Sequence, residues 1–490
     1  MATKLIVSNK SALTKKYGAQ GQIAIHKAVL TLITADATHG ITTSIVYLDD
    51  PSTPSHVTVA SDQKQNKTAI DAVWAAKKPN LLMILGSLDV VPHQELTDPV
   101  VGDSDPLVPS DLPYACNAAY SKDIHKFLSP TRAVSRLPDV TGATDPKPFI
   151  ALIDRPNPSA LLSNYVKFLG ATATVWQGSS DLSLSNIFGA GNTAHPCPPN
   201  GPNWPIADIS THAHFFNLHG SPGDPHFYGQ LGGSYPIAHS AAYVQGKVKA
   251  GTITASEACY GAQLYDPVKL GVHMPMSNTY LYGGAYAYFG STTIAYGPSV
   301  GNGQADLTCQ YFLIHLRAGE SIGVAGLKTR TQFIAANPAL GPTDLKTIAQ
   351  FLVLGDPSVF PVVTRHQPNI HVTTIPTIPW TEWIQDLSIV ENASVVAGDR
   401  ATFAIDRGQV AMGAVAVPRV EAMPDMQWTH VETRNYGFEG KVGGDAKLVA
   451  SAPSNLVLDV WRGHAPFPMF LIREHRTVNG HDDVRVYVSR

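Results

Sequence analysis

Short apolar stretches alternate with longer amphipathic stretches through the first part of the chain. Lys4–Ser8, 42–50 and Leu81–Leu85 are short runs of apolar and β-branched residues, which predict strands. Between them, Ile23–Ala35 and Thr68–Lys77 have the apolar spacing of helices. A regular alternation of this kind is typical of βαβ units in a parallel sheet. We therefore interpret this region as an N-terminal α/β subdomain.

The same pattern returns further along the chain. The segments 148–155 and 171–176 predict strands, and Ala160–Leu169 predicts a helix between them that Gly170 would end. Gly303–Ala318 predicts a later helix. This second region is therefore also expected to be α/β.

Two further apolar runs in this region each end in a residue capable of chemistry. THAHFFNLHG ends at His219-Gly220, and GTITASEACYG contains Cys259. Each run predicts a buried parallel strand, and the 40 positions from His219 to Cys259 suit one βαβ crossover. Because the carboxyl ends of neighbouring parallel strands meet at one sheet edge, we expect the imidazole and the thiol to meet there.

The composition changes at about residue 366. The stretch HQPNIHVTTIPTIPW is rich in Pro and Thr, as linkers are. Beyond it, Ala401–Ile405 and Val484–Val488 alternate apolar and polar residues, which is typical of an antiparallel sandwich. The expected parts are an N-terminal α/β subdomain (1–145), an α/β subdomain with both candidate residues (146–365), a linker (366–385) and a β-sandwich-like domain (386–490).

Composition narrows the choice of partners. Charged residues make up 15% of the chain and the net charge is −3, so electrostatics gives no reason to expect nucleic acid or an anionic membrane. No apolar run is long enough to span a membrane, and the N-terminus lacks the apolar core of a signal peptide. We therefore expect a soluble protein that is cytoplasmic by default, with the oligomeric state left open. Four cysteines do not form a disulfide framework, which leaves Cys259 free to react.

A thiol beside an imidazole is a chemical pair with a known use. An ordinary thiol is only a few per cent ionised at neutral pH, so a nucleophilic cysteine is usually activated by a nearby imidazole and a helix N-terminus. Gly220 would allow a substrate backbone to approach, and the N–H groups of Gly220 and Cys259 could form an oxyanion hole. The pattern predicts a Cys/His hydrolase that requires no cofactor. The alternative for each residue is a structural role in the core.

The two motifs also resemble those of a known family. HG after one strand and EACYG after the next resemble the caspase-like (clan CD) cysteine peptidases, and EACYG is especially close to the form found in legumains. The flanking sequence is closest to the gingipain family, on the segments NLLMILGSLDVVP (80–92), SNTYLYGGAYAYFGSTTIAYG (277–297) and QFLVLGDPSVFPV (350–362). The resemblance covers about residues 1–365. It implies a caspase-like, doubly wound, mostly parallel α/β fold, cysteine endopeptidase activity on polypeptides, and a following immunoglobulin-like module.

The resemblance also suggests which residues would surround the substrate. Glu257, two positions before the cysteine, would favour a basic residue or Asn at P1. Ser291 and Thr292, within the 277–297 motif, would contact the substrate. Asp154 is the candidate for orienting His219, although the acidic loop of the gingipain family is short here. A structural calcium ion is compatible with the resemblance.

Two other sites and a non-enzymatic role remain open. His212, His214, His219 and His226 could bind a catalytic metal, but few carboxylates accompany them. Ser299 lies in a GPSVG sequence that matches the G-x-S-x-G elbow of serine hydrolases, although Pro298 suits such a turn poorly. A caspase-like chain can also lose activity and serve as a binding module, because fold does not determine function.

Overall fold

The computed structural model describes residues 2–299, 301–337 and 340–363, together with five strands between Trp428 and Val488. The residues up to 363 form one compact unit, apart from Ile334–Leu340, and the five later strands belong to a second unit. The helices of the first unit are α1 (Lys10–Thr38), α2 (Gln63–Lys77), α3 (Lys147–Ile153), α4 (Gln177–Phe188), α5 (Ile206–Ile209), α6 (Ala241–Val244), α7 (Pro267–Leu270), α8 (Met276–Gly283), α9 (Gln304–Arg317), α10 (Ile322–Ala336) and α11 (Pro342–Gln350). Its strands are β1 (Ala2–Ser8), β2 (Ile41–Tyr47), β3 (Leu81–Leu85), β4 (Gln94–Thr97), β5 (Leu107–Ser110), β6 (Ala133–Leu137), β7 (Ala160–Leu161), β8 (Phe168–Ala173), β9 (His195–Cys197), β10 (Ala213–Asn217), β11 (His226–Tyr228), β12 (Ile237–Ser240), β13 (Ile253–Ser256), β14 (Ala287–Ser291), β15 (Phe351–Leu354) and β16 (Val362–Val363).

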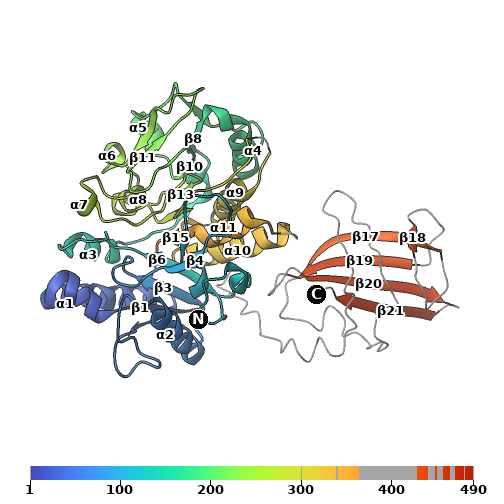
Figure 1. The fold of residues 1–490 in the computed structure, drawn as a ribbon, viewed down its shortest axis with the longest axis horizontal. Helices are drawn as coiled ribbons and strands as arrows, with labels where there is room; N and C mark the ends of the chain where they lie inside the picture. Colours follow the sequence, from blue (N-terminus) through green and yellow to red (C-terminus); the bar gives the residue numbers. More distant parts are fainter. Residues whose placement is uncertain are drawn as a thin grey trace. The chain divides into compact units, whose positions relative to one another are not determined.

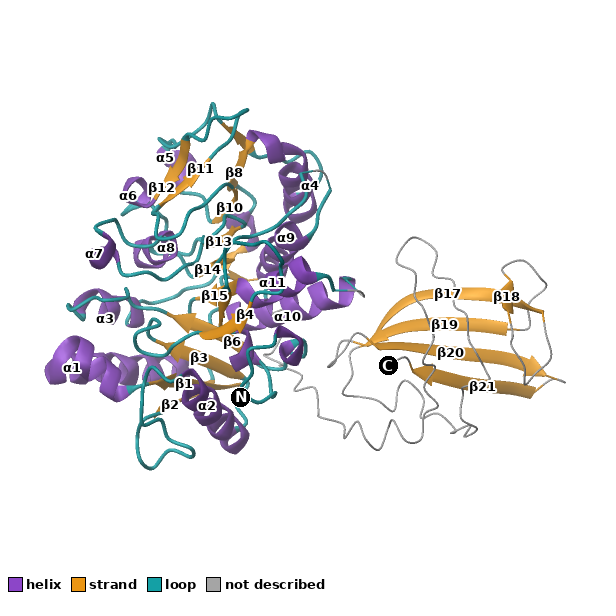
Figure 2. Cartoon of the chain, in the orientation of Figure 1, coloured by secondary structure: helices purple, strands orange, loops and turns teal. Residues whose placement is uncertain are grey.

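A single ten-stranded sheet runs through the first unit, in the order β2-β1-β3-β6-β15-β14-β13-β10-β8-β9 (Figures 1 and 2). All neighbours are parallel except β14 and β15, which pair antiparallel. The two halves of the sheet therefore run in opposite directions, and their carboxyl ends lie at opposite edges. The predicted mostly parallel α/β fold is confirmed, while the subdomain boundary at residue 145 stays a prediction.

Helices cover both faces of the sheet because successive strand residues point to opposite sides. On β14, Phe289 stacks on Phe312 of α9, whereas its neighbour Tyr288 packs against Tyr280 of α8. Figure 1 accordingly shows α4, α9 and α10 on one side of the sheet, with α6 and α8 on the other. Strands buried on both faces read as continuous apolar runs, which is why they were visible in the sequence.

Two predictions for the second α/β region are wrong. Residues 148–155, expected to be a strand, belong mostly to helix α3, with Pro148 in its first turn. The buried residues Phe149, Leu152 and Ile153 have helical spacing, which is hard to distinguish from a strand in so short a segment.

The helix expected over Ala160–Leu169 is also absent. That segment contains the short strand β7, a 3₁₀ turn over Leu162–Tyr165 and the start of β8. Gly170 lies within β8, opposite Phe215 of β10, where a side chain would collide with Leu184 of α4. It is a close-packing position and not a helix end.

The second unit contains one antiparallel sheet among its described residues. Its strands are β17 (Trp428–Glu439), β18 (Lys447–Val449), β19 (Leu456–Gly463), β20 (Met469–Val478) and β21 (His481–Val488), in the order β18-β17-β19-β20-β21. The strand predicted at Val484–Val488 is confirmed within β21. The linker at 366–385 and the strand at Ala401–Ile405 lie outside the described residues. In the described part of the chain, no helix combines the length and the apolar character that a membrane crossing requires.

Candidate active site

His219 and Cys259 follow two neighbouring parallel strands. β10 and β13 pair in register from Ala213 with Ile253 to Phe216 with Ser256. His219 lies just beyond the carboxyl end of β10, and Cys259 just beyond the carboxyl end of β13. The two residues therefore extend from the same edge of the sheet, as the motif spacing predicts.

The segments that carry these residues are in direct contact. A β-carbon added to Gly220 would lie 1.8 Å from the carbonyl oxygen of Cys259 and 3.4 Å from its nitrogen. Only glycine fits at this position, because any side chain would collide with backbone that cannot rotate away. The chain after the histidine is thus packed against the backbone of the cysteine.

Several backbone N–H groups converge on the sulfur of Cys259. The N–H of Ala295 lies 3.4 Å from Sγ, and the N–H groups of Gly220 and Cys259 itself also interact with it. Burial raises the pKa of the Cys259 thiol, the three N–H groups oppose this rise, and the Asp105 carboxylate adds to it. No helix begins at Cys259, since the next helix is α7, so the N–H groups stand in for a helix N-terminus.

The turn around the cysteine is held in an unusual conformation. Tyr260 has a φ of 57°, in the left-handed region that non-glycine residues rarely occupy. Its hydroxyl donates a hydrogen bond to Asp105 (2.7 Å), and Ser291 donates to the carbonyl of Ala258 (2.9 Å). These bonds anchor the turn on both sides of Cys259.

The imidazole of His219 lies among uncharged groups. Its Nε2 is 2.7 Å from Oε1 of Gln230. Its ring centroid is 4.3 Å from that of Trp176 and 5.1 Å from that of Tyr235. Burial lowers the pKa of His219, and the hydrogen bond with Gln230 partly opposes this effect. Among the hydrogen bonds of the described residues, none joins the imidazole to the thiol.

Asp154 does not lie where its proposed role requires. It follows helix α3, since the strand that was to carry it does not form, and its side chain is exposed. The neighbour of β10 on the side away from β13 is β8, and Trp176 comes soon after the end of β8. Gln230, and not Asp154, is the hydrogen-bond partner of the His219 imidazole.

Glu257 faces the scaffold. It is 6% exposed, and its carboxyl group interacts with Asp306 of α9. Burial raises the pKa of Glu257 well above its usual value, with Asp306 adding to the rise, and burial raises the pKa of Asp306 to about 6. This contact favours the alternative in which Glu257 supports the strand and does not enter a substrate pocket.

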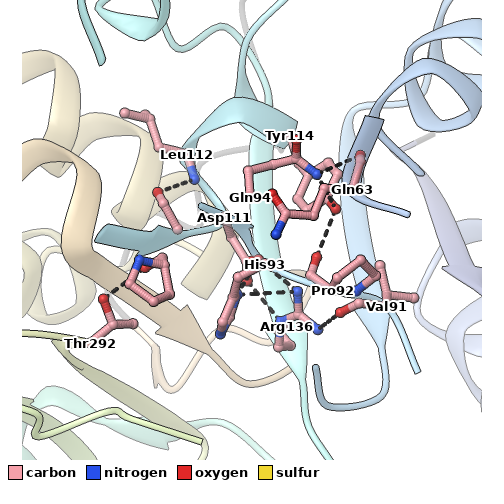
Figure 3. Close-up of polar contacts among 12 residues, drawn as sticks. Gln63, Val91, Pro92, His93, Gln94, Asp111, Leu112, Tyr114, Arg136 and Thr292 are labelled. Atoms are coloured by element: carbon pink, nitrogen blue, oxygen red, sulfur yellow. Dashed lines mark hydrogen bonds and ion pairs between the residues drawn. The ribbon is translucent and has the colours of Figure 1, made fainter. Parts of the chain in front are cut away.

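Ser291 and Thr292 also make internal contacts. Both are buried, and Ser291 donates to the carbonyl of Ala258. Thr292 donates to the carbonyl of Pro109, at the end of the network around Arg136 in Figure 3. In that network Arg136 of β6 pairs with the Asp111 carboxylate, which also bonds His93. Ser291 and Thr292 therefore position the loop beside Cys259 and do not face solvent.

The four histidines of the metal hypothesis do not come together. His212 lies just before β10, at the end opposite His219, and packs on Tyr165. His214 is buried and bonds the hydroxyl of Tyr280, and His226 bonds Asp224. Within the described residues, the one set of three potential ligands is Asp98, Asp103 and Asp105.

The Lys346 ammonium lies among these three carboxylates. It is 2.7 Å from Asp98 and 3.1 Å from Asp105, and it also pairs with Asp103. It supplies the positive charge that a cation would bring, so a calcium ion could bind there only by displacing it. This cage fixes Asp105 next to Tyr260 and Cys259.

In the described part of the chain, Ser299 lacks the histidine partner that a serine nucleophile needs. Ser299 is exposed in the loop between β14 and α9, and no histidine of the described residues hydrogen-bonds its hydroxyl. A nucleophile elbow joins a strand directly to a helix, and this loop does not.

Sequence reasoning missed three residues of this site. Trp176 ends an apolar run and was interpreted as a strand residue. Gln230 belongs to a Gly-rich segment with no periodicity, and Asp105 comes from a loop more than 150 positions before Cys259. The one local signal for any of the three was the position of Trp176, an aromatic residue soon after β8, the strand next to β10.

No family model matches the sequence, and no curated protein matches it. The chain is similar to two solved structures. One is described as a protease, and the other is the complex of the pro- and mature domains of RgpB from Porphyromonas gingivalis. The first is 14% identical, with 99% of this chain and 97% of the other aligned and a TM-score of 0.48. The second is 10% identical, with 100% of both chains aligned and a TM-score of 0.49. Since both scores are below 0.5, the chemistry of the site has to be inferred from its own geometry.

Proposed function

We propose that this chain is a cysteine-type endopeptidase in which Cys259 is the nucleophile and His219 the general base. The observation that carries the proposal is the packing of Gly220 against the backbone of Cys259, a partly exposed cysteine whose sulfur accepts a hydrogen bond from the N–H of Ala295. A buried structural cysteine does not need such a donor. The Cys/His motif resemblance supports the same assignment.

The geometry suggests how peptide hydrolysis would proceed. His219 takes the proton of the thiol as sulfur attacks the scissile carbonyl, and the N–H groups of Gly220 and Cys259 stabilise the resulting oxyanion. The imidazolium then gives its proton to the leaving amine, which leaves a thioester on Cys259. Water attacks the thioester with His219 again as base, releasing the acid and the free thiol. No metal or cofactor takes part in these steps.

The P1 preference is proposed to be basic or Asn, as the motif resemblance implies. Neither nearby carboxylate carries this preference by itself: Glu257 is held against Asp306, and Asp105 pairs with Lys346 and accepts a hydrogen bond from the Tyr260 hydroxyl. A library of fluorogenic peptides that vary at P1 tests this directly: cleavage after Asp in preference to Arg, Lys and Asn contradicts it.

One observation favours the alternative of an inactive binding module. The imidazole of His219 bonds Gln230, and burial raises the pKa of the thiol and lowers the pKa of the imidazole, which favours the neutral form of both. Hydrolysis of the library that Cys259→Ala removes and Ser299→Ala leaves intact supports the peptidase. Peptide binding without any turnover supports the module instead.

A further inference from the structure

The hairpin after His219 presents an amide to the imidazole in a fixed orientation. The N–H of Gln230 donates to the carbonyl of Cys197 (2.9 Å), which fixes the start of its side chain. The side-chain Nε2 of Gln230 donates to the carbonyl of Gly232 (3.2 Å), so its Oε1 is the atom that faces His219, at 2.7 Å.

This orientation determines the tautomer of the histidine. An amide oxygen can only accept a hydrogen bond, so Nε2 of His219 has to carry the proton. Nδ1 is then unprotonated and available as a base. The rings of Trp176 and Tyr235 pack against the imidazole and restrict its rotation.

We propose that Gln230 is the positioning residue of this site: it fixes His219 as the Nε2–H tautomer and, being uncharged, keeps the imidazole neutral at rest. A positioning role for Gln230 rests on the proposed use of His219 as the base. The contact between the two side chains is independent of that proposal. A carboxylate in the same place would stabilise the imidazolium and so draw the proton from the thiol before substrate arrives. With an amide there, the proton leaves sulfur only during attack.

The surroundings of His219 support a neutral resting pair. Burial lowers the pKa of His219 and the hydrogen bond with Gln230 raises it, and no charged side chain contributes to the shift. The contacts from the neighbouring elements include Trp176 after β8, Tyr228 of β11, which pairs with the His219 backbone, and Gln230 and Tyr235 of the hairpin. Near the thiol, the charged groups are Asp105, which disfavours the thiolate, and Lys346, which pairs with Asp105.

The tautomer can be read by ¹⁵N NMR of the histidine-labelled full chain, with the His219 signals assigned by their loss in His219→Asn. We expect Nε2 protonated and Nδ1 not, and a mixture of tautomers in Gln230→Leu. The matched control is Gln245→Leu. Gln245 makes the same kind of contact elsewhere in the fold, with its Oε1 2.9 Å from Nε2 of His273. His219 protonated on Nδ1, or unchanged in Gln230→Leu, overturns the proposal.

The charge argument is tested by the pH dependence of Cys259 alkylation with iodoacetamide, followed by mass spectrometry. In the native chain the rate should follow a single ionisation above neutral pH. In Gln230→Glu the rate at pH 6.5 should rise on the order of tenfold, as a shift of about one pKa unit would give. An unchanged profile in Gln230→Glu, or an acid-side thiolate plateau already in the native chain, contradicts the proposal. Both readouts need no peptide turnover, so they stand or fall separately from the peptidase assignment.

Discussion

Gly220 and Cys259 are in backbone contact across two strand ends, so closely that a β-carbon on the first would lie 1.8 Å from the carbonyl oxygen of the second. This contact brings the histidine segment to the cysteine and aligns the N–H groups of both residues at one sulfur. It is the feature that most restricts what the site can do.

Gly220→Ala should therefore disable the site. The added methyl group has to push the two loops apart, which removes the Gly220 N–H from the sulfur, and loss of one oxyanion donor costs on the order of 10²-fold in rate. The readout is the rate of Cys259 labelling by a peptidyl electrophile. Gly233→Ala is the control, because Gly233 lies in the hairpin that follows Gly220 and has open space around it. Equal labelling rates in the two variants would mean that the contact is unimportant.

The Glu257–Asp306 pair should make stability depend on pH. Both pKa values are raised in the folded protein, so from about pH 4 up to these values the folded state binds more protons than the unfolded state. Stability should fall as pH rises through about 6 and beyond. Glu257→Gln should reduce this loss by on the order of a few °C in melting temperature at the upper end of the window.

The control for this variant is Glu320→Gln, which removes a carboxylate that pairs with Lys328 elsewhere. In this variant the melting temperature should change with pH as it does in the native chain, between pH 5 and about 8. If Glu257→Gln also leaves this pH dependence unchanged, burial beside Asp306 does not raise the pKa of Glu257.

Lys346→Met should be strongly destabilising. It leaves the carboxylates of Asp98, Asp103 and Asp105 together without the ammonium that pairs with all three, and breaking a buried pair in this way costs about 3–5 kcal/mol. Denaturant unfolding measures the loss. Lys328→Met, at a pair whose lysine is 40% exposed, should cost less than about 1 kcal/mol. Comparable losses in both variants would argue against the cage.

Addition of calcium to the Lys346→Met variant extends this experiment. With the ammonium gone, the three carboxylates offer oxygen ligands to a hard cation. Recovery of stability with calcium, and not with sodium at equal ionic strength, would indicate that the cage can hold an ion. Absence of recovery would limit its role to binding Lys346.

The sequence predicted the strands best where both faces are buried. β3, β10 and β13 are buried along their whole length, and the order of β10 and β13 along the chain was enough to place His219 and Cys259 at one edge. Segments at the margin of the sheet were harder. The helix α3 and the start of β8 are short, so helix and strand spacing could not be told apart.

The surroundings of the two reactive residues depend on tertiary contacts that leave no local pattern. Glu257 was predicted to face a substrate, but the direction of a side chain just after a strand depends on the packing of α9, which supplies Asp306. The partner of His219 was expected to be a carboxylate near residue 154, and the hairpin that supplies Gln230 gives no periodic signal.

The most direct test of the proposed function is covalent labelling of the full chain with a peptidyl electrophile that carries Arg at P1, read by peptide mass spectrometry. We expect modification at Cys259 and at none of Cys116, Cys197 and Cys309, which are buried. Cys259→Ala should abolish both labelling and peptide hydrolysis, by a factor on the order of 10³ or more, while its melting temperature stays close to that of the native chain. Labelling at Ser299, or hydrolysis that persists in Cys259→Ala, would contradict the assignment of Cys259 as the nucleophile.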